Sequence, residues 1–167
     1  MKAIVAVDKR WGIGKNNGLL FHLPADMKYF RENTTGKVVV MGSNTLLSFP
    51  GGKPLKNRTN IVLWPGGEKR EDCIVADSLA ELKEILRAYP PDDVFVIGGG
   101  MFHRTMLPYC TEVLVTKVDA DGDATVFYEN LDLRPEWSCV SASEPVEDGG
   151  YRLRFTVYRN ASPEAFV

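Results

Sequence analysis

Three short segments of this chain are apolar almost throughout, and they constrain the fold more than any other feature. They are Lys2–Val7, Lys37–Met41 and Asp93–Ile97, each rich in β-branched residues and bounded by turn residues. A strand with one face in water alternates apolar and polar residues, whereas a continuous apolar run is typical of a strand covered on both faces. The sequence therefore predicts a mainly parallel sheet between two layers of helices. Further strands are predicted at Thr59–Leu63, Cys73–Val75 and Glu112–Val118.

Helix signals lie between these strands, as a parallel sheet requires. Leu23–Glu32 has a proline at its second position, a residue that suits the first turn of a helix. Ser78 and Glu81 have the spacing of a capping box ahead of apolar residues at helical intervals. Shorter helices are predicted after Gly42 and after the glycine run at 98–100.

The last quarter of the chain has a different pattern. Arg152–Val157 alternates polar and apolar residues, so Trp137–Tyr158 is predicted to form an antiparallel hairpin at one edge of the sheet. A length of 167 residues fits one domain, and the sequence shows no repeat and no linker. We therefore predict one α/β domain over residues 1–167. Its expected architecture is a three-layer sandwich with a mainly parallel central sheet and an antiparallel C-terminal edge hairpin.

Charge and cysteine content exclude several classes of function. The 20 basic and 22 acidic residues give a net charge of −2, which removes the positive field that non-specific nucleic-acid binding needs. The three cysteines lie far apart without a C-x-x-C pair, which argues against a disulfide framework and a zinc site. The apolar stretch 3–7 is too short for a signal sequence or a membrane span. We expect a cytoplasmic monomer with no metal, nucleic-acid or membrane site.

Two glycine turns are candidates for binding phosphate. Gly98-Gly99-Gly100 follows a predicted strand and opens a predicted helix, and Gly42-Ser43-Asn44-Thr45 repeats that arrangement. The free N–H groups at a helix start bind anions, and ligands of α/β sheets sit at the carboxyl ends of the strands. The two turns together therefore suggest a dinucleotide site. The alternative is a pair of tight turns in which glycine only permits close packing.

Two polar residues stand at positions that suggest an interior site. Helical spacing places Asp26 beside Leu23, Met27 and Phe30, and a carboxyl group in apolar surroundings holds its proton to higher pH. The alternative is an ordinary acid in the first turn of a helix, where the helix dipole favours it. Thr116 shares a strand face with apolar residues, and its hydroxyl either serves the same interior or bonds to the backbone.

Arg58 stands at the mouth of a predicted strand. Its guanidinium group is suited to gripping a carboxylate through two hydrogen bonds, and the alternative is a solvated surface charge.

A series of short motifs runs in order from Ile4 to about Phe127. The motifs are Ile4-Val5-Ala6, Gly12-Ile13-Gly14, Leu23-Pro24-Ala25-Asp26 with Phe30 four residues on, Met41-Gly42 with Thr45, Pro54-Leu55 with Asn57-Arg58, Ile97-Gly98-Gly99-Gly100 and Val115-Thr116. Each is weak alone, but in this order over three quarters of the chain they resemble the dihydrofolate reductase family. The length also agrees with that single-domain family.

The resemblance implies reduction of 7,8-dihydrofolate to tetrahydrofolate by NADPH, with a proton added beside the carbon that receives the hydride. It implies catalytic roles for Asp26, which promotes that protonation, for Thr116 as its hydroxyl partner and for Phe21. Arg58 matches the residue that grips the glutamate carboxylate of the substrate. The implied contacts of the pterin and benzoyl rings are Ile4, Ala6, Met27, Phe30, Phe49, Leu55 and Ile97. The implied cofactor contacts are Ala6, Ile13, Gly14, Leu19, Gly42, Ser43, Asn44, Thr45, Leu63, Trp64, Gly98, Gly99, Gly100, Met101 and Phe102.

Several positions depart from the family pattern. Phe21 stands where tryptophan is usual, so an indole N–H donor is missing there. Ser43 occupies a position that often carries an arginine for the 2′-phosphate of NADPH, and Met101 and Trp64 also replace polar or basic residues. NADH is therefore an alternative cofactor, unless Lys53, Lys69 or Arg70 supplies the missing charge. His103 stands where tyrosine is common, with a surface histidine as the plain alternative.

Two other functions fit the same residues. One is the related reductase of riboflavin synthesis, which acts on a ribosylaminopyrimidine phosphate. The Leu-Pro-Ala-Asp motif and Arg58 favour folate over that substrate. The other is a noncatalytic folate or nucleotide binder, which the change at Phe21 leaves open.

Overall fold

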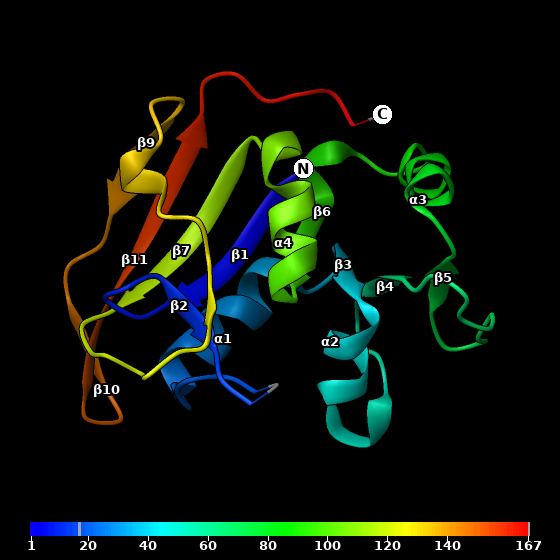
Figure 1. Cartoon of the computed structure of the whole chain (residues 1–167). Helices are drawn as coiled ribbons and strands as arrows, with labels where there is room; N and C mark the ends of the chain where they lie inside the picture. The colour runs from blue at the N-terminus through cyan, green and yellow to red at the C-terminus, as the bar shows by residue number, and fades with distance from the viewer. Residues whose placement is uncertain (17, 167) are drawn as a thin grey trace.

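The predicted apolar runs form the middle of one large mixed sheet in the computed structural model, which describes residues 1–16 and 18–166 (Figure 1). The strands in spatial order are β10 (Val146–Asp148), β11 (Tyr151–Asn160), β7 (Glu112–Val118), β1 (Lys2–Val7), β6 (Val94–Gly98), β3 (Val38–Gly42), β4 (Thr59–Leu63) and β5 (Ile74–Ala76). From β7 to β5 every neighbouring pair is parallel. The predicted bounds of β1, β4 and β7 are confirmed, and β3, β5 and β6 each begin and end one residue later than predicted.

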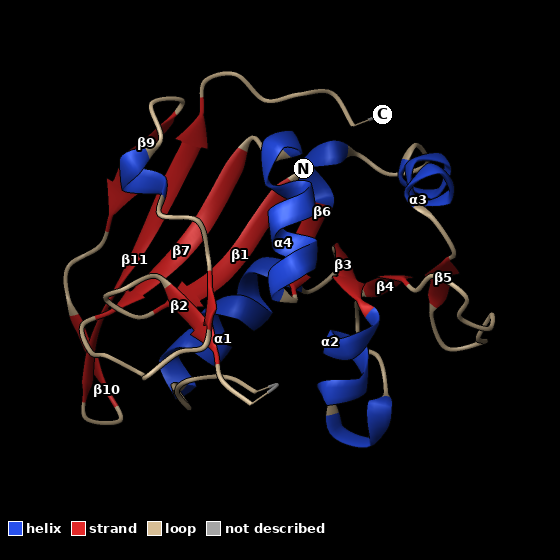
Figure 2. Ribbon diagram, viewed as in Figure 1, coloured by secondary structure: helices blue, strands red, loops and turns tan. Residues whose placement is uncertain are grey.

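Helices cover both faces of this sheet, which gives the predicted three layers (Figure 2). The helices are α1 (Pro24–Thr34), α2 (Ser43–Ser48), α3 (Leu79–Leu86) and α4 (Gly100–Met106), with short 3-10 turns at Pro50–Gly52, Pro91–Asp93, Leu107–Tyr109 and Leu131–Leu133. Alternate residues of β3 show the division of the core. Val38 and Val40 pack with residues of α3 and α4, whereas Val39 and Met41 pack with Leu46 of α2.

Local signals set the helix starts. The Ser78 hydroxyl accepts a hydrogen bond from the N–H of Glu81 at 3.1 Å, so the predicted capping box starts α3. Such a cap contributes about 1 kcal/mol. In contrast, α1 has Pro24 at its first position, and Leu23 before it has no side chain that can cap. The first turn of α1 therefore needs a hydrogen-bond acceptor from elsewhere in the chain.

The C-terminal strands form the predicted antiparallel edge with one addition. β11 pairs with β7 on one side. On its other side it pairs first with β10, through the turn at Gly149 and Gly150, and then with β9 (Trp137–Ala142). The edge therefore consists of the predicted hairpin and a further strand that extends it.

A second, small sheet was not predicted. Gly12–Gly14 (β2) pairs antiparallel with Val126–Phe127 (β8). These strands have three and two residues, too few to show a periodic pattern. The small sheet joins the loop after β1 to the segment after β7.

The main sheet opens at the carboxyl ends of its central strands. β1 pairs with β7 along six residues but with β6 along only two, Lys2 with Phe95 and Ala3 with Val96. Beyond these two pairs, the described residues of β1 and β6 form no further ladder. No helix among residues 1–16 and 18–166 is long and apolar enough to cross a membrane.

Candidate active site

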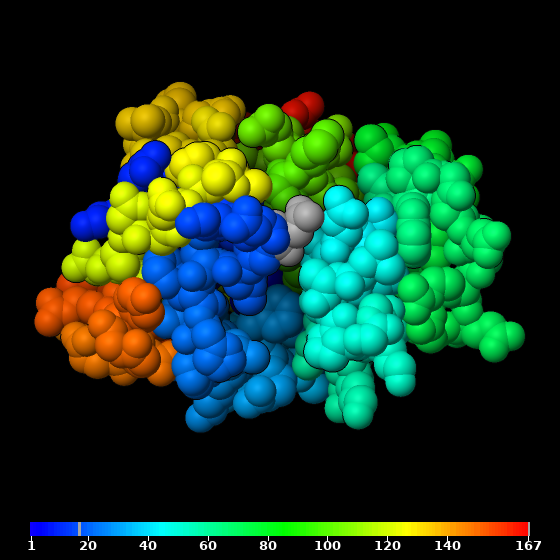
Figure 3. All heavy atoms as spheres, turned by 60° about the horizontal axis from the view of Figure 1, so that its bottom comes forward, coloured from blue at the N-terminus to red at the C-terminus, as the bar shows by residue number. Residues whose placement is uncertain are grey.

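The opening between β1 and β6 lies between two helices of the same layer. α1 follows β1, and α2 follows β3, which lies on the other side of β6. The space-filling view shows a hollow between the blue surface of the α1 region and the cyan surface of α2 (Figure 3). The chain leaves β1 toward α1 on one face of the sheet and leaves β6 toward α4 on the other face, and ligands of α/β sheets bind at such points. This hollow is the candidate active site.

Asp26 and Thr116 meet at one end of the opening. Asp26 lies in the first turn of α1, and Thr116 lies on β7 directly beside Ala6 of β1. The Thr116 hydroxyl donates a hydrogen bond to Asp26 Oδ1 at 2.7 Å. Thr116 is buried, with 1% of its surface exposed, so the carboxylate is its interior partner as the sequence suggested.

The surroundings of Asp26 favour its protonated form. Burial raises the pKa of this carboxyl group above its ordinary value. The hydrogen bond from Thr116 lowers the pKa in part, and the nearby Asp148 carboxylate raises it. Asp26 in turn adds to the raised pKa of Tyr29, whose main cause is burial. A group of this kind can hold a proton closer to neutral pH than an ordinary aspartate.

Apolar residues predicted to contact the substrate line the walls beside Asp26. Ile4 and Phe30 pack with Ile97 in one cluster beneath α1. Phe49 and Leu55 pack in a second cluster beneath α2, and Ile97 also belongs to it. Ile97 therefore joins the two walls at the floor. Of the other two predicted contacts, Met27 on α1 is 49% exposed and Ala6 is partly buried.

Arg58 lies half-buried at the rim of these walls. Its guanidinium carbon is 5.9 Å from the ring centre of Phe30. Its Nε is buried and has no hydrogen-bond partner among the described residues. Burial, and then the neighbouring charge of Arg31, lower the pKa of Arg58. An arginine in this state favours an anionic ligand, because a carboxylate would satisfy its N–H groups and offset both costs.

The two glycine turns are adjacent, as β3 and β6 are neighbours. A β-carbon on Gly42 would lie 3.8 Å from Phe102 Cβ and 3.9 Å from the Gly99 nitrogen. Gly98 has a φ of +144°, which favours glycine, and a β-carbon there would lie 3.1 Å from Thr45 Oγ1. The peptide bond between Gly98 and Gly99 is cis. Both turns thus present backbone at the same edge, beside the opening.

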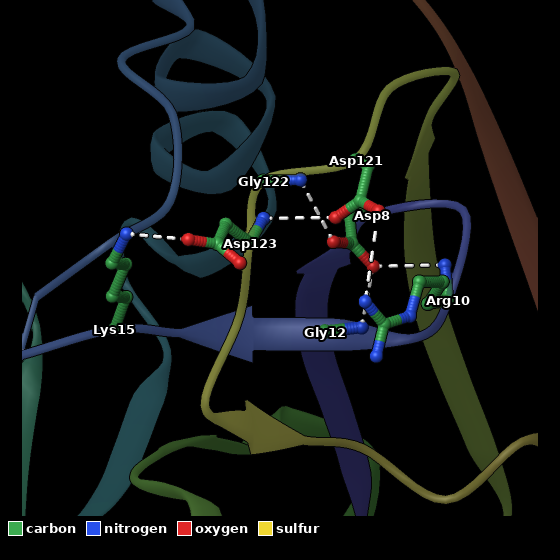
Figure 4. A network of polar contacts seen from close by, with 7 residues as sticks. All are labelled: Asp8, Arg10, Gly12, Lys15, Asp121, Gly122 and Asp123. Carbon is green, nitrogen blue, oxygen red and sulfur yellow. Dashed lines mark hydrogen bonds and ion pairs between the residues drawn. The ribbon is translucent and has the colours of Figure 1, made fainter.

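The loop between β1 and α1 covers the third side and is tied down by Asp8 (Figure 4). Asp8 is 2% exposed, and its carboxylate accepts hydrogen bonds from the N–H groups of Arg10, Gly12 and Gly122 at 2.7–3.0 Å. Ion pairs join Arg10 to Asp121 and Lys15 to Asp123 in the same network. The first part of the loop is therefore fixed to the turn after β7. Asp8 is not among the predicted site residues, because a single acid after a strand carries no distinctive pattern.

Further along this loop the predicted contacts differ in exposure. Ile13 lies in β2 and would be 3.8 Å from a β-carbon on Gly100, so it reaches the start of α4. Gly14 follows it, and Leu19 is 83% exposed. Phe21 is partly buried and packs on Tyr151 with ring centres 4.8 Å apart. The contact between these two rings therefore fixes the end of the loop to the C-terminal hairpin.

The remaining predicted cofactor contacts surround the glycine turns. Ser43 and exposed Asn44 begin α2, Leu63 ends β4, and Trp64 packs in the cluster beneath α2. Met101 on α4 is 85% exposed. Two basic residues considered as sources of missing charge are already paired, since Lys69 contacts Glu81 and Arg70 contacts Asp72.

His103 is not a surface histidine, so that alternative is wrong. It is 4% exposed on α4, and burial lowers its pKa to about 4. Its Nε2 would lie 4.0 Å from a β-carbon on Gly98, so the imidazole lies close to the glycine turn. Helical spacing already groups His103 with Met106 and Leu107, and this signal would have predicted its burial.

No group of three or more His, Cys, Asp or Glu side chains within residues 1–16 and 18–166 is arranged to hold a metal ion. The residues gathered at the opening are a carboxyl group with a raised pKa, an arginine with a buried, unpaired Nε, apolar walls and two glycine turns. Such a set can bind a flat, partly apolar anion beside a phosphate-bearing cofactor and can handle one proton.

Comparisons with known proteins agree with this chemistry. A family model described as "Dihydrofolate reductase" matches residues 1–160. The dihydrofolate reductase of Bacillus subtilis (strain 168) is 32% identical over 158 residues, which cover 93% of this chain and 91% of that protein. That of Haemophilus influenzae is 38% identical over 134 residues, covering 80% and 81%. The bifunctional dihydrofolate reductase-thymidylate synthase of Glycine max is 33% identical over 178 residues, covering 94% of this chain and 33% of that protein.

Proposed function

Because the chain belongs to the dihydrofolate reductase family, we propose that it reduces 7,8-dihydrofolate to tetrahydrofolate with NADPH and that Asp26 handles the proton of this reaction. The observation that carries the proposal is the pairing of Asp26 with Thr116 at the opening between β1 and β6. A carboxyl group held there by a buried hydroxyl stands beside the apolar walls that would hold the pterin.

Asp26 has two tasks in this proposal. Its carboxyl group hydrogen-bonds the pterin, and it promotes protonation of the ring nitrogen next to the carbon that is reduced. Thr116 keeps the carboxyl group in place while burial keeps it able to hold a proton. General acid assistance works best when the pKa of the acid lies near the working pH. The raised pKa of Asp26 therefore supports this role.

Arg58 would bind the glutamate carboxylate of dihydrofolate. The buried, unpaired Nε of Arg58 supports this role, and Phe30 beneath the guanidinium group would also contact the benzoyl ring. A guanidinium group binds a phosphate as well as a carboxylate, so the preference for folate over a ribosylaminopyrimidine phosphate rests on the Leu-Pro-Ala-Asp motif of α1 and on Phe30 beside Arg58. Ile4, Phe49, Leu55 and Ile97 would exclude water around the rings and align them.

The residues present fit a dinucleotide cofactor. NADPH, when bound, supplies the hydride. Gly42–Thr45 and Gly98–Phe102 would hold its phosphates through the free backbone N–H groups at the two helix starts. The two turns lie close enough to act together, since a β-carbon on Gly98 would crowd Thr45. Met101 and Leu19 would bury exposed apolar surface against it.

Discrimination between NADPH and NADH should be weak. Ser43, Trp64 and Met101 bring no positive charge to a 2′-phosphate, and Lys69 and Arg70 already contact acids, so only Lys53 remains of the three basic residues considered. We expect the dissociation constants of NADP⁺ and NAD⁺, measured by tryptophan fluorescence quenching, to differ by less than about tenfold, which is ~1.4 kcal/mol. A ratio above a hundredfold would show that another cation reaches the phosphate.

The direct test of the proposed reaction is the loss of reduced-nicotinamide absorbance after mixing the protein with dihydrofolate and NADPH. We expect steady decay with dihydrofolate and much slower decay for Asp26→Asn at neutral pH, with partial recovery in acid, where solvent protonates the substrate. Absence of decay at micromolar protein, together with tight folate binding, would identify a noncatalytic binder instead. An Asp26→Asn enzyme with the wild-type pH profile would remove Asp26 from the proposal.

A further inference from the structure

The helix that carries Asp26 is capped by a residue from the opposite end of the chain. Leu23, at the N-cap position of α1, offers no side-chain acceptor. The N–H of Ala25, next to Asp26, instead donates a hydrogen bond to Asp148 Oδ2 at 2.7 Å. Asp148 is the last residue of β10, immediately before the turn to β11. Its carboxylate therefore satisfies a free N–H group in the first turn of α1.

The hairpin that carries Asp148 is docked on this region by its own contacts. Tyr151 packs on Phe21, and Phe155 stacks on Tyr29 with ring centres 4.3 Å apart. Phe21 precedes α1 and Tyr29 lies on it. The hairpin that carries Asp148 is therefore docked by apolar packing as well as by the hydrogen bond from Ala25.

The same carboxylate also acts on Asp26 through its charge. The groups that face Asp26 are the Thr116 hydroxyl from β7, Tyr29 from its own helix and Asp148 from the hairpin. Asp148 is the charged group among them, and its negative charge opposes ionisation of Asp26. The effect adds to burial, the larger cause of the raised pKa, and opposes that of Thr116.

We propose that Asp148 is a positioning residue for Asp26, which fixes the first turn of α1 from the C-terminal hairpin and places a second negative charge beside the carboxyl group. This inference rests on the proposed role of Asp26 in the reaction. It assigns the hairpin a part in catalysis, although no residue of the hairpin was predicted to touch substrate or cofactor. The two contributions of Asp148, hydrogen bond and charge, are separable by substitution.

Asp148→Asn keeps an oxygen acceptor for the Ala25 N–H and removes the charge, whereas Asp148→Ala removes both. Glu147→Gln is the matched control, because the neighbouring Glu147 is exposed and pairs with Arg152 on the hairpin itself. Two measurements follow Asp26 directly: the ¹³C titration of its carboxyl carbon in the free protein, and the pH dependence of hydride transfer in single turnovers. Hydrogen exchange at the Ala25 amide follows the cap.

We expect both Asp148 variants to lower the pKa of Asp26 and to shift the rate profile to lower pH. At alkaline pH, where the rate follows the protonated fraction, transfer should slow about two- to fivefold. Only Asp148→Ala should speed exchange at Ala25, by about two- to thirtyfold, the range for loss of a helix cap. Glu147→Gln should match the wild type in all three measurements.

An unchanged titration and rate profile in Asp148→Asn would overturn the charge part of the inference, even if Asp148→Ala fails to fold. Unchanged exchange at the Ala25 amide in a folded Asp148→Ala would overturn the cap. Asp26→Asn, measured in parallel, separates the two levels of the proposal. If Asp26→Asn has the wild-type profile, the proposed role of Asp26 fails. If Asp26→Asn alters the profile and Asp148→Asn does not, only the charge role of Asp148 fails.

Discussion

The hydroxyl of Thr116 on β7 donates a 2.7 Å hydrogen bond to Asp26 Oδ1 in the first turn of α1, although the two residues lie 90 positions apart in the sequence. Burial and this bond act on Asp26 in opposite directions, since burial favours the neutral acid and the donated hydrogen bond favours the carboxylate. The proton affinity of Asp26 is thus set by a balance in which burial is the larger effect.

Thr116→Val should raise the pKa of Asp26 further. Valine keeps the volume but removes the donor, so the pKa of Asp26 rises and the pH profile of hydride transfer moves to higher pH. The fold should lose about 1 kcal/mol for the missing hydrogen bond. Thr156→Val is the control, because its buried hydroxyl donates to the Val115 carbonyl and not to Asp26. If Thr156→Val moves the pH profile of hydride transfer as far as Thr116→Val does, the change is a general packing effect and not the loss of the hydrogen bond to Asp26.

Asp26→Asn should make the protein more stable at neutral pH. The pKa of Asp26 is higher in the folded chain than in the unfolded one, so its contribution favours folding at acid pH and is lost as the pH rises through the folded pKa. Asparagine carries no charge to bury and still accepts from Thr116. We expect a gain of ~0.5–2 kcal/mol at pH 7.5 that shrinks toward pH 4, measured by urea unfolding.

Glu32→Gln on the same helix is the control for this stability change, since Glu32 is exposed and pairs only loosely with Lys28 at 3.8 Å. It should change stability by no more than about 0.5 kcal/mol. Lower stability of Asp26→Asn than of the wild type at pH 7.5 would contradict the view that the ionised carboxylate is held at a cost for function.

The sequence predicted the sheet and the family well, and the physical reason is local. Apolar runs such as Lys2–Val7 and caps such as Ser78 carry their signal within a few residues, and the family expected from ordered motifs is confirmed. The contact of Asp148 with Ala25 has no such signal, because an acid before two glycines fits any surface turn. Long-range polar contacts of this kind depend on how the hairpin docks.

The same distinction holds within the site. Ile4, Phe30 and Ile97 could be grouped in advance since each lies on a predicted element with a defined inward face. The lack of a partner for Arg58 Nε could not be predicted, because it depends on which described residues the fold brings close to it. Its role, like those of the other predicted contacts, stays a prediction until tested.

Arg58→Leu should weaken binding of dihydrofolate with little change in kcat. Losing a charge-assisted hydrogen-bonding group costs about 1.5–3 kcal/mol, so KM should rise roughly ten- to hundredfold. A reduced pterin without the glutamate should bind the variant and the wild type alike. Arg87→Leu, at an exposed arginine that ends α3, is the control. Equal weakening for both ligands would mean that Arg58 supports the walls of the site rather than the carboxylate.

Acid should destabilise the fold through His103. Its pKa falls from 6.5 to about 4 on burial, so the folded state holds the neutral ring, and stability present above pH 6.5 is lost as the pH falls toward 4. At ~1.4 kcal/mol per pKa unit the loss is ~3 kcal/mol. His103→Phe, which keeps a ring against Tyr128, should lose correspondingly less between pH 6.5 and 4 in urea unfolding. His22→Gln, at the exposed histidine, should follow the wild type, and a His103→Phe curve parallel to the wild type would assign the acid loss to the carboxylates instead.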